Sequence, residues 1–271
     1  MDGTTLNSQH ALTPRTVEAI RRADALGLQV IIATGRPVAS LQPFIDQLSL
    51  KSPVPAVCFN GACAMMLRAN TPEENRVLLS RGLDREAARL VLQLCEERDW
   101  CVSHSSPGGA AAAPRSPQQE EQLRAFEALE GIKQERVASL DLLDLPPPLK
   151  LVVLAEDPEA CAALARASLP DGVANIIAAE MHIEFLSRSV SKGDTLQRLC
   201  ADHLGISIAE VIAFGDNHND REMLQLVGHG VAMHNAKDAV KAIAARVCKW
   251  SNDDEGIARE LEALMATMEV E

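Results

Sequence analysis

The sequence lacks several features that would assign it to a specialised class of protein. Its seven cysteines form no C-x-x-C pair and lie in apolar surroundings, so we interpret them as small buried side chains in a reducing compartment. No apolar run approaches the length of a membrane span. Residues 1–16 are polar and therefore do not form a signal peptide.

Positive charge is also scarce. The chain has 26 Lys and Arg against 38 Asp and Glu, which gives a formal net charge of -12 and a pI near 5.1. We therefore expect neither nucleic acid nor an anionic membrane as a partner. A bound phosphate group would need a metal or a local basic cluster. With 271 residues, 47% of them hydrophobic, the chain can form one large domain or two modest ones.

Short apolar segments followed by small polar turns recur along the chain. Residues 28–33, 54–59 and 211–214 are aliphatic or β-branched without alternation, which is typical of strands buried on both faces. Helical patterns lie between them, and one begins at Thr13-Pro14. Strands that alternate with helices predict an α/β fold, with a parallel sheet whose turns line one edge.

The pattern changes in the middle of the chain. We interpret residues 65–186 as a smaller α+β domain inserted into a core domain of residues 1–64 and 187–271. Within the insert, residues 105–119 are rich in Pro, Gly, Ala and Ser. This composition predicts an ill-ordered surface insertion.

Four polar clusters lie at the ends of predicted core elements. They are residues 2–4, 34–36, 192–193 and 216–220. Ligands of open α/β sheets bind at the carboxyl ends of the strands. Phosphoryl transfer needs cations for the phosphoryl oxygens, neutral donors that orient them, and a proton donor for the leaving oxygen. The residue types in the four clusters fit these requirements.

Individual roles follow from this chemistry. Asp216 with Asp220 can hold Mg²⁺, which prefers hard carboxylate oxygens. Lys192 can supply a fixed cation, Thr34 a hydroxyl donor, and Asp2 an acid or base.

The same residues also have structural interpretations. Residues 216–220 can be a solvated turn in which Asp220 caps the next helix. Thr34 can be a plain strand-end residue, and Lys192 a solvated charge at the start of a helix. Arg36 can belong to a surface ion pair, and Asn60 can be an ordinary turn residue.

The order of the motifs resembles a known family. D-G-T near the start is followed by ATGRP, SKGDTL and FGDNHND, with FNGA, VAMHNA and SNDDEG as further matches. This series resembles the haloacid-dehalogenase superfamily of phosphatases, and in particular its Cof-type, sugar-phosphatase-like branch. The resemblance covers nearly the whole chain and implies a Rossmann-like parallel-sheet core with an inserted α+β cap domain.

The resemblance also implies roles for individual residues. Thr34 would bind the transferring phosphoryl group, and Lys192 would stabilise the charge of that group and of the nucleophile. Asp2 would protonate the leaving oxygen while its backbone carbonyl contacts the metal.

The remaining implied roles concern the metal and the substrate. Asp216 would ligate Mg²⁺ directly, supported by Asn219 and Asp220. Arg36, Asn60 and Gly61 match positions near the phosphate and the cap.

One departure from the family pattern affects the chemistry directly. The family motif is D-x-D-G-T, and its first Asp attacks phosphorus. Met1 occupies the x position here, so the place of the nucleophile falls before the first residue. The apolar strand that would precede it, between the strands at 211–214 and 28–33, is absent as well. About five buried side chains at roughly 1.5 to 3 kcal/mol each would be lost, which is comparable with the net stability of a domain.

We therefore expect that the sequence begins at an internal Met of a longer protein, with a real shortened isoform or a degenerate enzyme as the alternative. The first functional hypothesis is a Mg²⁺-dependent phosphatase of small phosphorylated metabolites, such as sugar phosphates. In the full-length protein it would use an aspartyl-phosphate intermediate, and this chain alone would have little or no activity. The second is a non-catalytic protein that binds phosphorylated metabolites. A phosphomutase or phosphonatase is a weaker rival. The expected location is the cytoplasm or another reducing compartment, such as an organelle stroma.

Overall fold

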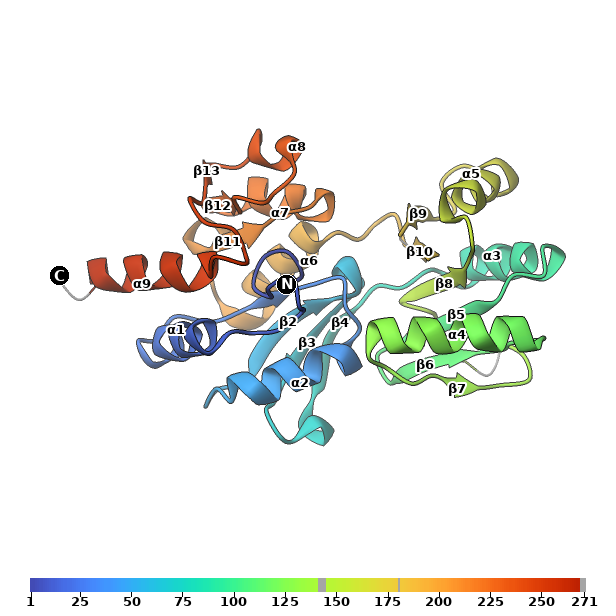
Figure 1. Cartoon of the computed structure of the whole chain (residues 1–271), viewed down its shortest axis with the longest axis horizontal. Coiled ribbons are helices and arrows are strands. Elements are labelled where there is room, and N and C mark those ends of the chain that lie inside the picture. Colours follow the sequence, from blue (N-terminus) through green and yellow to red (C-terminus); the bar gives the residue numbers. More distant parts are fainter. Residues whose placement is uncertain (141–144, 180, 269–271) are drawn as a thin grey trace. The chain divides into compact units, whose positions relative to one another are not determined.

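The structure, a computed structural model, describes residues 1–140, 145–179 and 181–268 (Figure 1). It divides into two compact units. The core unit comprises Met1–Gly35, Leu41–Leu79 and Ser191–Glu271, and the cap unit comprises Arg36–Ser40 and Ser80–Val190. The sequence predicted a core domain of residues 1–64 and 187–271 and a cap domain of residues 65–186. These boundaries stay a prediction. Within the described ranges, no helix is long and apolar enough to cross a membrane.

The strands of the core unit form two sheets. The first has the order β1 (Ile32–Ala33), β2 (Val54–Cys58), β3 (Cys63–Leu67), β4 (Arg76–Ser80). β1 is parallel to β2, and β2 is antiparallel to β3. The second sheet is parallel, with the order β11 (Ile212–Gly215), β12 (His229–Ala232), β13 (Arg246–Val247). The parallel pairing expected for the core is present in both sheets, and the first sheet also contains an antiparallel pair.

Among the described residues, six α-helices accompany the core strands along the chain. They are α1 (Pro14–Ala25), α2 (Val38–Leu48), α6 (Lys192–Leu199), α7 (Arg221–Leu226), α8 (Asp238–Lys241) and α9 (Gly256–Met268). The predicted start of α1 is confirmed, because Thr13 caps the helix by accepting a hydrogen bond from the Thr16 N–H. α1 and α9 lie side by side (Figure 1). The Arg15 guanidinium donates to Glu262 across them.

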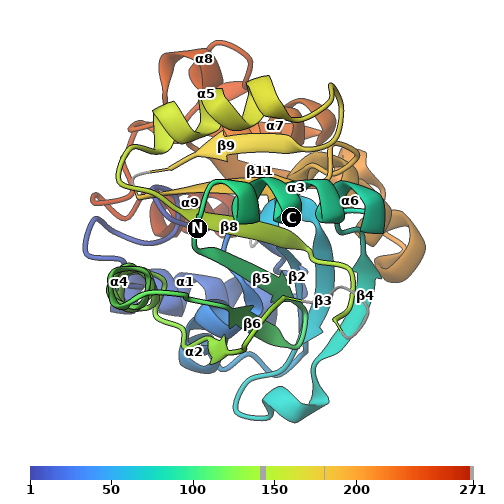
Figure 2. The same cartoon turned by 90° about the vertical axis from the view of Figure 1, so that its right-hand side faces the viewer.

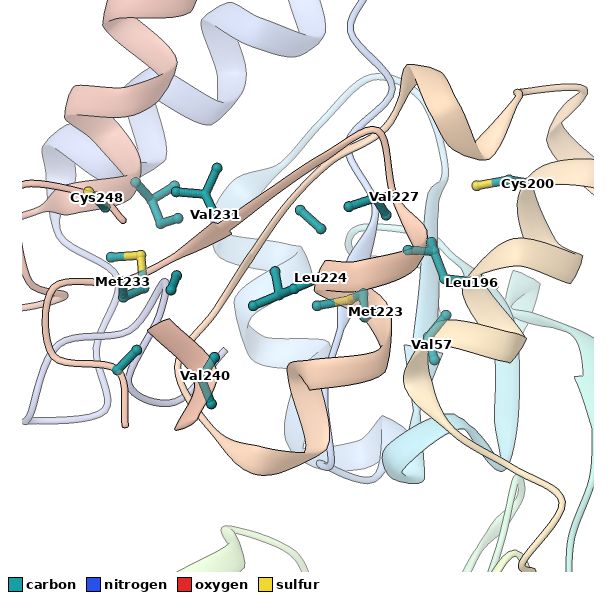
Figure 3. Close-up of a cluster of buried hydrophobic side chains, with 14 of the residues drawn as sticks. Val57, Leu196, Cys200, Met223, Leu224, Val227, Val231, Met233, Val240 and Cys248 are labelled. Atoms are coloured by element: carbon teal, nitrogen blue, oxygen red, sulfur yellow. The ribbon is translucent and has the colours of Figure 1, made fainter. Parts of the chain in front are cut away.

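A single hydrophobic cluster connects the two core sheets. Met223 and Leu224 of α7 lie between Leu196 of α6 and Val231 of β12 (Figure 3). The cluster also includes Val57 of β2 from the other sheet. The two sheets therefore share a core although, among the described residues, they exchange no ladder hydrogen bonds.

The cap unit is a six-stranded sheet with helices on both faces. Its order is β7 (Glu135–Arg136), β6 (Gly109–Ala112), β5 (Val102–Ser106), β8 (Lys150–Leu154), β10 (His182–Leu186), β9 (Asn175–Ala178). Because side chains alternate along a strand, Leu151 and Val153 of β8 face α3 (Arg85–Glu97) and α5 (Pro158–Ser168), whereas Val152 and Leu154 face α4 (Pro117–Glu130) (Figure 2).

The expectation of an ill-ordered insertion at residues 105–119 is wrong. This segment contains the end of β5, all of β6 and the start of α4. The alanines that resemble low-complexity sequence pack into the sheet, and Ala112 is fully buried beside Leu123 of α4. Ser116 caps α4 and Pro117 occupies its first turn, so the Ser and Pro that looked loop-like mark the start of a helix.

Candidate active site

The loop that follows β11 is organised by the side chain of Asp220. Its Oδ2 accepts hydrogen bonds from the backbone N–H groups of Asp216 at 3.0 Å and Asn217 at 3.1 Å. Its Oδ1 accepts from Lys192 Nζ at 2.8 Å. Asp220 is only 5% exposed. Both carboxylate oxygens of Asp220 therefore have protein donors, and the residue fixes the loop in the manner of a helix cap.

Lys192 reaches this loop from the first turn of α6. Ser191 caps that helix by accepting from the Asp194 N–H at 3.0 Å. Burial alone would raise the pKa of Asp220, but the charge and hydrogen bond of Lys192 hold it below its usual value. Lys192 and Asp220 are thus a buried ion pair, whose disruption would leave an uncompensated charge inside the protein.

Asp216 is the second carboxylate of the loop and lies against the N-terminal turn. Its Oδ1 accepts a hydrogen bond from Thr4 Oγ1 at 2.5 Å. Gly3, at φ +66°, allows this approach, because a Cβ there would lie 2.4 Å from Asp216 Oδ2. Burial raises the pKa of Asp216, and the charge of Asp220 adds to the shift. A nearby cation would stabilise the charged form of this carboxylate.

The turn Phe59–Gly61 links the end of β2 to the same loop. Asn60 Oδ1 accepts from Asn219 Nδ2 at 2.8 Å. The carbonyl oxygen of Gly61 accepts from Thr195 Oγ1 at 2.6 Å, and a Cβ on Gly61 would lie 2.1 Å from the Ser191 carbonyl oxygen. The turn is therefore held against the start of α6, beside Lys192.

Thr34 follows β1, and its backbone is hydrogen-bonded to Val57 of β2 and to Asn60 of the turn. Its N–H donates to the Val57 carbonyl at 2.8 Å, and its carbonyl accepts from the Asn60 N–H at 3.1 Å. Thr34 is 1% exposed. These hydrogen bonds thus bring Thr34, Asn60, Gly61 and the loop 216–220 into one connected region.

Asp2 and Arg36 are the two other predicted site residues. Asp2 belongs to the turn that Thr4 holds against Asp216. Its carboxylate oxygen Oδ1 lies 3.0 Å from His10 Nδ1, and its side chain is 42% exposed. Arg36 belongs to the short segment Arg36–Ser40 of the cap unit, so its role beside the core residues stays a prediction.

The predicted magnesium site is supported at one position. In the parts of the chain that the structure describes, no three His, Cys, Asp or Glu side chains are grouped to hold a metal. The half-buried carboxylate of Asp216 fits a metal ligand. Asp220 is committed to Lys192 and two backbone N–H groups. The full predicted set of Asp2, Asp216, Asn219 and Asp220 therefore stays a prediction.

Sequence reasoning missed the roles of two threonines. Thr4 contacts Asp216, 212 positions away, and Thr195 contacts Gly61, 134 positions away. Both lie inside motifs that the sequence analysis identified, D-G-T and SKGDTL. The motifs could have indicated that these threonines belong to the site. Their partners could not be predicted, because they are distant in the sequence.

Comparison with known proteins identifies the class of this chain. It belongs to the haloacid dehalogenase-like hydrolases, whose family model matches residues 1–261. The expected resemblance, the α/β fold with a cap domain, and an enzyme that hydrolyses phosphate esters are therefore confirmed.

Individual relatives extend over nearly the whole chain. The chain is 32% identical to the 5-amino-6-(5-phospho-D-ribitylamino)uracil phosphatase YitU of Bacillus subtilis, over 97% of this chain and 94% of the relative. It is 30% identical to the pyridoxal phosphate phosphatase YbhA of Escherichia coli, over 96% and 94%. A solved haloacid dehalogenase-like hydrolase from Bacteroides thetaiotaomicron shares the fold, with a TM-score of 0.82, 22% identity, and coverage of 97% and 96%.

Proposed function

We propose that the full-length protein is a Mg²⁺-dependent phosphatase of small phosphorylated metabolites and that it acts through an aspartyl-phosphate intermediate. The observation that carries this proposal is the buried Lys192, which Asp220 holds beside the half-buried carboxylate of Asp216. The names of YitU and YbhA support the substrate class, since each describes a phosphatase of a small phosphorylated compound.

The residues of this chain would divide the work as follows. Lys192 offsets negative charge on the transferring phosphoryl group, and the Thr34 hydroxyl donates to one of its oxygens. The attacking carboxylate forms a bond to phosphorus as the ester P–O bond breaks, and Asp2 gives a proton to the leaving oxygen. Water then hydrolyses the acyl phosphate and releases inorganic phosphate, with Asp2 accepting a proton in that step.

Magnesium belongs to the same proposal. Asp216 would bind it directly, with Asn219 and Asp220 holding the loop that carries Asp216. The ion would neutralise part of the phosphoryl charge.

The attacking aspartate is proposed to lie on an extended segment between the two core sheets. β1 and β11 are each at the edge of their sheet in the described residues. Ala33, Ile212 and Phe214 on these strands are only half-buried although they pack on the core cluster. A parallel strand between them would pair with both edges and cover these apolar side chains. Its last residues would place an aspartate just before Met1.

The experiment restores this segment. Five apolar residues followed by Asp are added directly before Met1, and the matched control carries Asn in place of that Asp. We expect the Asp version to hydrolyse p-nitrophenyl phosphate with Mg²⁺ and to lose this activity on chelation, while the Asn version stays inactive. A folded Asp version that is inert across a broad panel of phosphate esters would contradict the proposal.

A non-catalytic phosphometabolite-binding protein is the alternative. The residues that support it are the cation Lys192 and the hydroxyl donor Thr34, which could bind a phosphoryl group without turnover. It predicts that inorganic phosphate with Mg²⁺ raises the unfolding temperature of the chain, and that the Asp extension adds no turnover. Turnover that depends on the added Asp would decide against it.

A further inference from the structure

Two asparagines hold the N-terminal turn from outside the motifs assigned above. We propose that Asn235 and Asn252 are positioning residues, which together fix the turn of residues 2–6 relative to Asp216. This inference rests on the proposed function, because that turn carries Asp2. It adds a role for the segments VAMHNA and SNDDEG, which resembled the family in sequence but had no assigned task.

The two side chains form a continuous relay of amide hydrogen bonds. Asn235 Nδ2 donates to the Gly3 carbonyl oxygen at 2.7 Å. Asn235 Oδ1 accepts from the backbone N–H of Asn252 at 3.0 Å, and Asn252 Nδ2 donates to the Leu6 carbonyl oxygen at 2.9 Å. The relay therefore grips the turn at both ends, Gly3 and Leu6.

The loop that carries Asn235 is itself attached to the backbone around Asp216. The Met233 N–H donates to the Gly215 carbonyl at 2.9 Å, and the Lys237 N–H donates to the Asp216 carbonyl at 3.0 Å. Asn235 lies midway between these two bonds. A displacement of Asp216 would thus move Asn235, and through it the turn. The relay therefore couples the position of the turn of residues 2–6 to that of Asp216, and the proposed reaction requires both to be correctly placed.

The turn is also held by other contacts, and its Leu6 side chain is fully buried. The Met1 carbonyl accepts from the N–H groups of Thr4, Thr5 and Leu6 at 3.1, 2.8 and 3.0 Å, which shapes the turn internally. Thr4 Oγ1 contacts Asp216, and the Ser8 N–H donates to Asp253. The relay binds the carbonyl groups of Gly3 and Leu6. An error of about 1 Å in the position of a reacting group can cost about 100-fold in rate.

Exposure distinguishes this role from simple packing. Asn235 is exposed and Asn252 is half-buried, so neither side chain fills the core. Their contribution is directional hydrogen bonding rather than burial. Loss of the relay should therefore loosen the turn more than it destabilises the fold.

The first test uses the chain as it stands and needs no activity. Asn235→Asp is isosteric and keeps an acceptor for the Asn252 N–H, but it loses the donor to Gly3 and sets a negative charge against a carbonyl oxygen. We expect hydrogen exchange at the amides of residues 4–6 to accelerate about tenfold in Asn235→Asp and in Asn252→Ala, because local opening becomes easier. Asn175→Asp, on the exposed face of the cap strand β9, is the matched control and should leave these amides unchanged. Unchanged exchange in both relay variants would overturn the proposal.

The second test uses the protein with the added strand and Asp. Positioning predicts that Asn235→Asp lowers kcat about tenfold while KM stays within about twofold, since the side chain holds the acid turn rather than the substrate. A purely structural effect would instead lower the unfolding temperature and leave kcat of the folded fraction unchanged, and that result would overturn the catalytic part. If the unsubstituted extended protein is inactive, the proposed function fails, whereas the exchange measurement still decides whether the relay holds the turn.

Discussion

Each unit of the molecule contains one buried lysine paired with a buried carboxylate. In the core, Lys192 Nζ lies 2.8 Å from Asp220 Oδ1, and in the cap, Lys150 Nζ lies 2.5 Å from Glu184 Oε1. All four residues are less than a tenth exposed. Burial of two charges costs several kcal/mol per ion before their attraction is counted, so both pairs need further stabilising contacts.

The two pairs differ in where they lie on their sheets. Asp220 follows the carboxyl end of β11 and also accepts from the backbone of its own loop, next to Asp216. Lys150 and Glu184 lie on neighbouring antiparallel strands, β8 and β10, where His182 is also 3.6 Å from Glu184. The core pair stands where α/β sheets bind ligands, whereas the cap pair stands within the sheet. Under the proposed function, the core pair would supply charge at a reaction site, whereas the cap pair would stabilise the pairing of two strands.

The largest expected difference between the two pairs is in kcat when each lysine is replaced in the extended, Asp-bearing protein. Lys192→Met should lower kcat about 1000-fold, because a cation in a water-excluded site is lost from the transition state. Lys150→Met should leave the kcat of the folded protein within about threefold. Steady-state hydrolysis of p-nitrophenyl phosphate measures both, with circular dichroism to confirm folding. Similar losses in the two variants would show that the pairs do not differ in task.

Stability should respond differently in the cap. Lys150→Met leaves Glu184 buried without its cation, and this should cost about 3 kcal/mol. The double variant Lys150→Met with Glu184→Leu should recover most of that loss, because an apolar pair of similar volume needs no compensating charge. Urea unfolding followed by Trp100 in a Trp250→Phe background reports the cap, since these are the two tryptophans of the chain. A double variant as unstable as the single one would refute this account.

The sequence located the site loops better than the strands that carry them. The polar turns at 34–36, 60–61 and 216–220 were predicted because each follows an apolar run. The structure connects them through backbone hydrogen bonds of Thr34 and a side-chain hydrogen bond between Asn219 and Asn60. The strand expected at residues 28–33 is only Ile32–Ala33, however. Periodicity cannot define a strand's length, because the length depends on a neighbour with which to pair.

Contacts between distant segments explain the remaining misses. Lys150 is followed by four apolar residues in β8, and Glu184 lies between Ile183 and Phe185 in β10, so their pairing became visible only from the register of the two strands. The alanines of β6 had no apolar bulk by which to predict a strand, and Ala112 is buried because it packs beside Leu123 and Phe126 of α4. In each case tertiary packing outweighed local propensity.

The smallest predicted effect is an acid-dependent loss of cap stability. Burial alone would raise the pKa of Glu184, yet the charge of Lys150 lowers it from 4.5 to about 2. Because the folded pKa lies below the unfolded value, the contribution is present above pH 4.5 and is lost as the pH falls toward 2. Between about pH 5.5 and about pH 3, this group should remove about 2 kcal/mol from the free energy of unfolding.

The double variant Lys150→Met with Glu184→Leu is the control for this acid dependence. Other cap carboxylates, such as Glu120 and Glu127 beside Arg136, titrate in both proteins and cancel when the two are subtracted. The difference between the two urea-unfolding curves, followed by Trp100 at each pH, therefore isolates Glu184. The unsubstituted cap should lose stability over this range faster than the double variant. Parallel dependence on pH would mean that Glu184 is not held ionised by Lys150 in the folded cap.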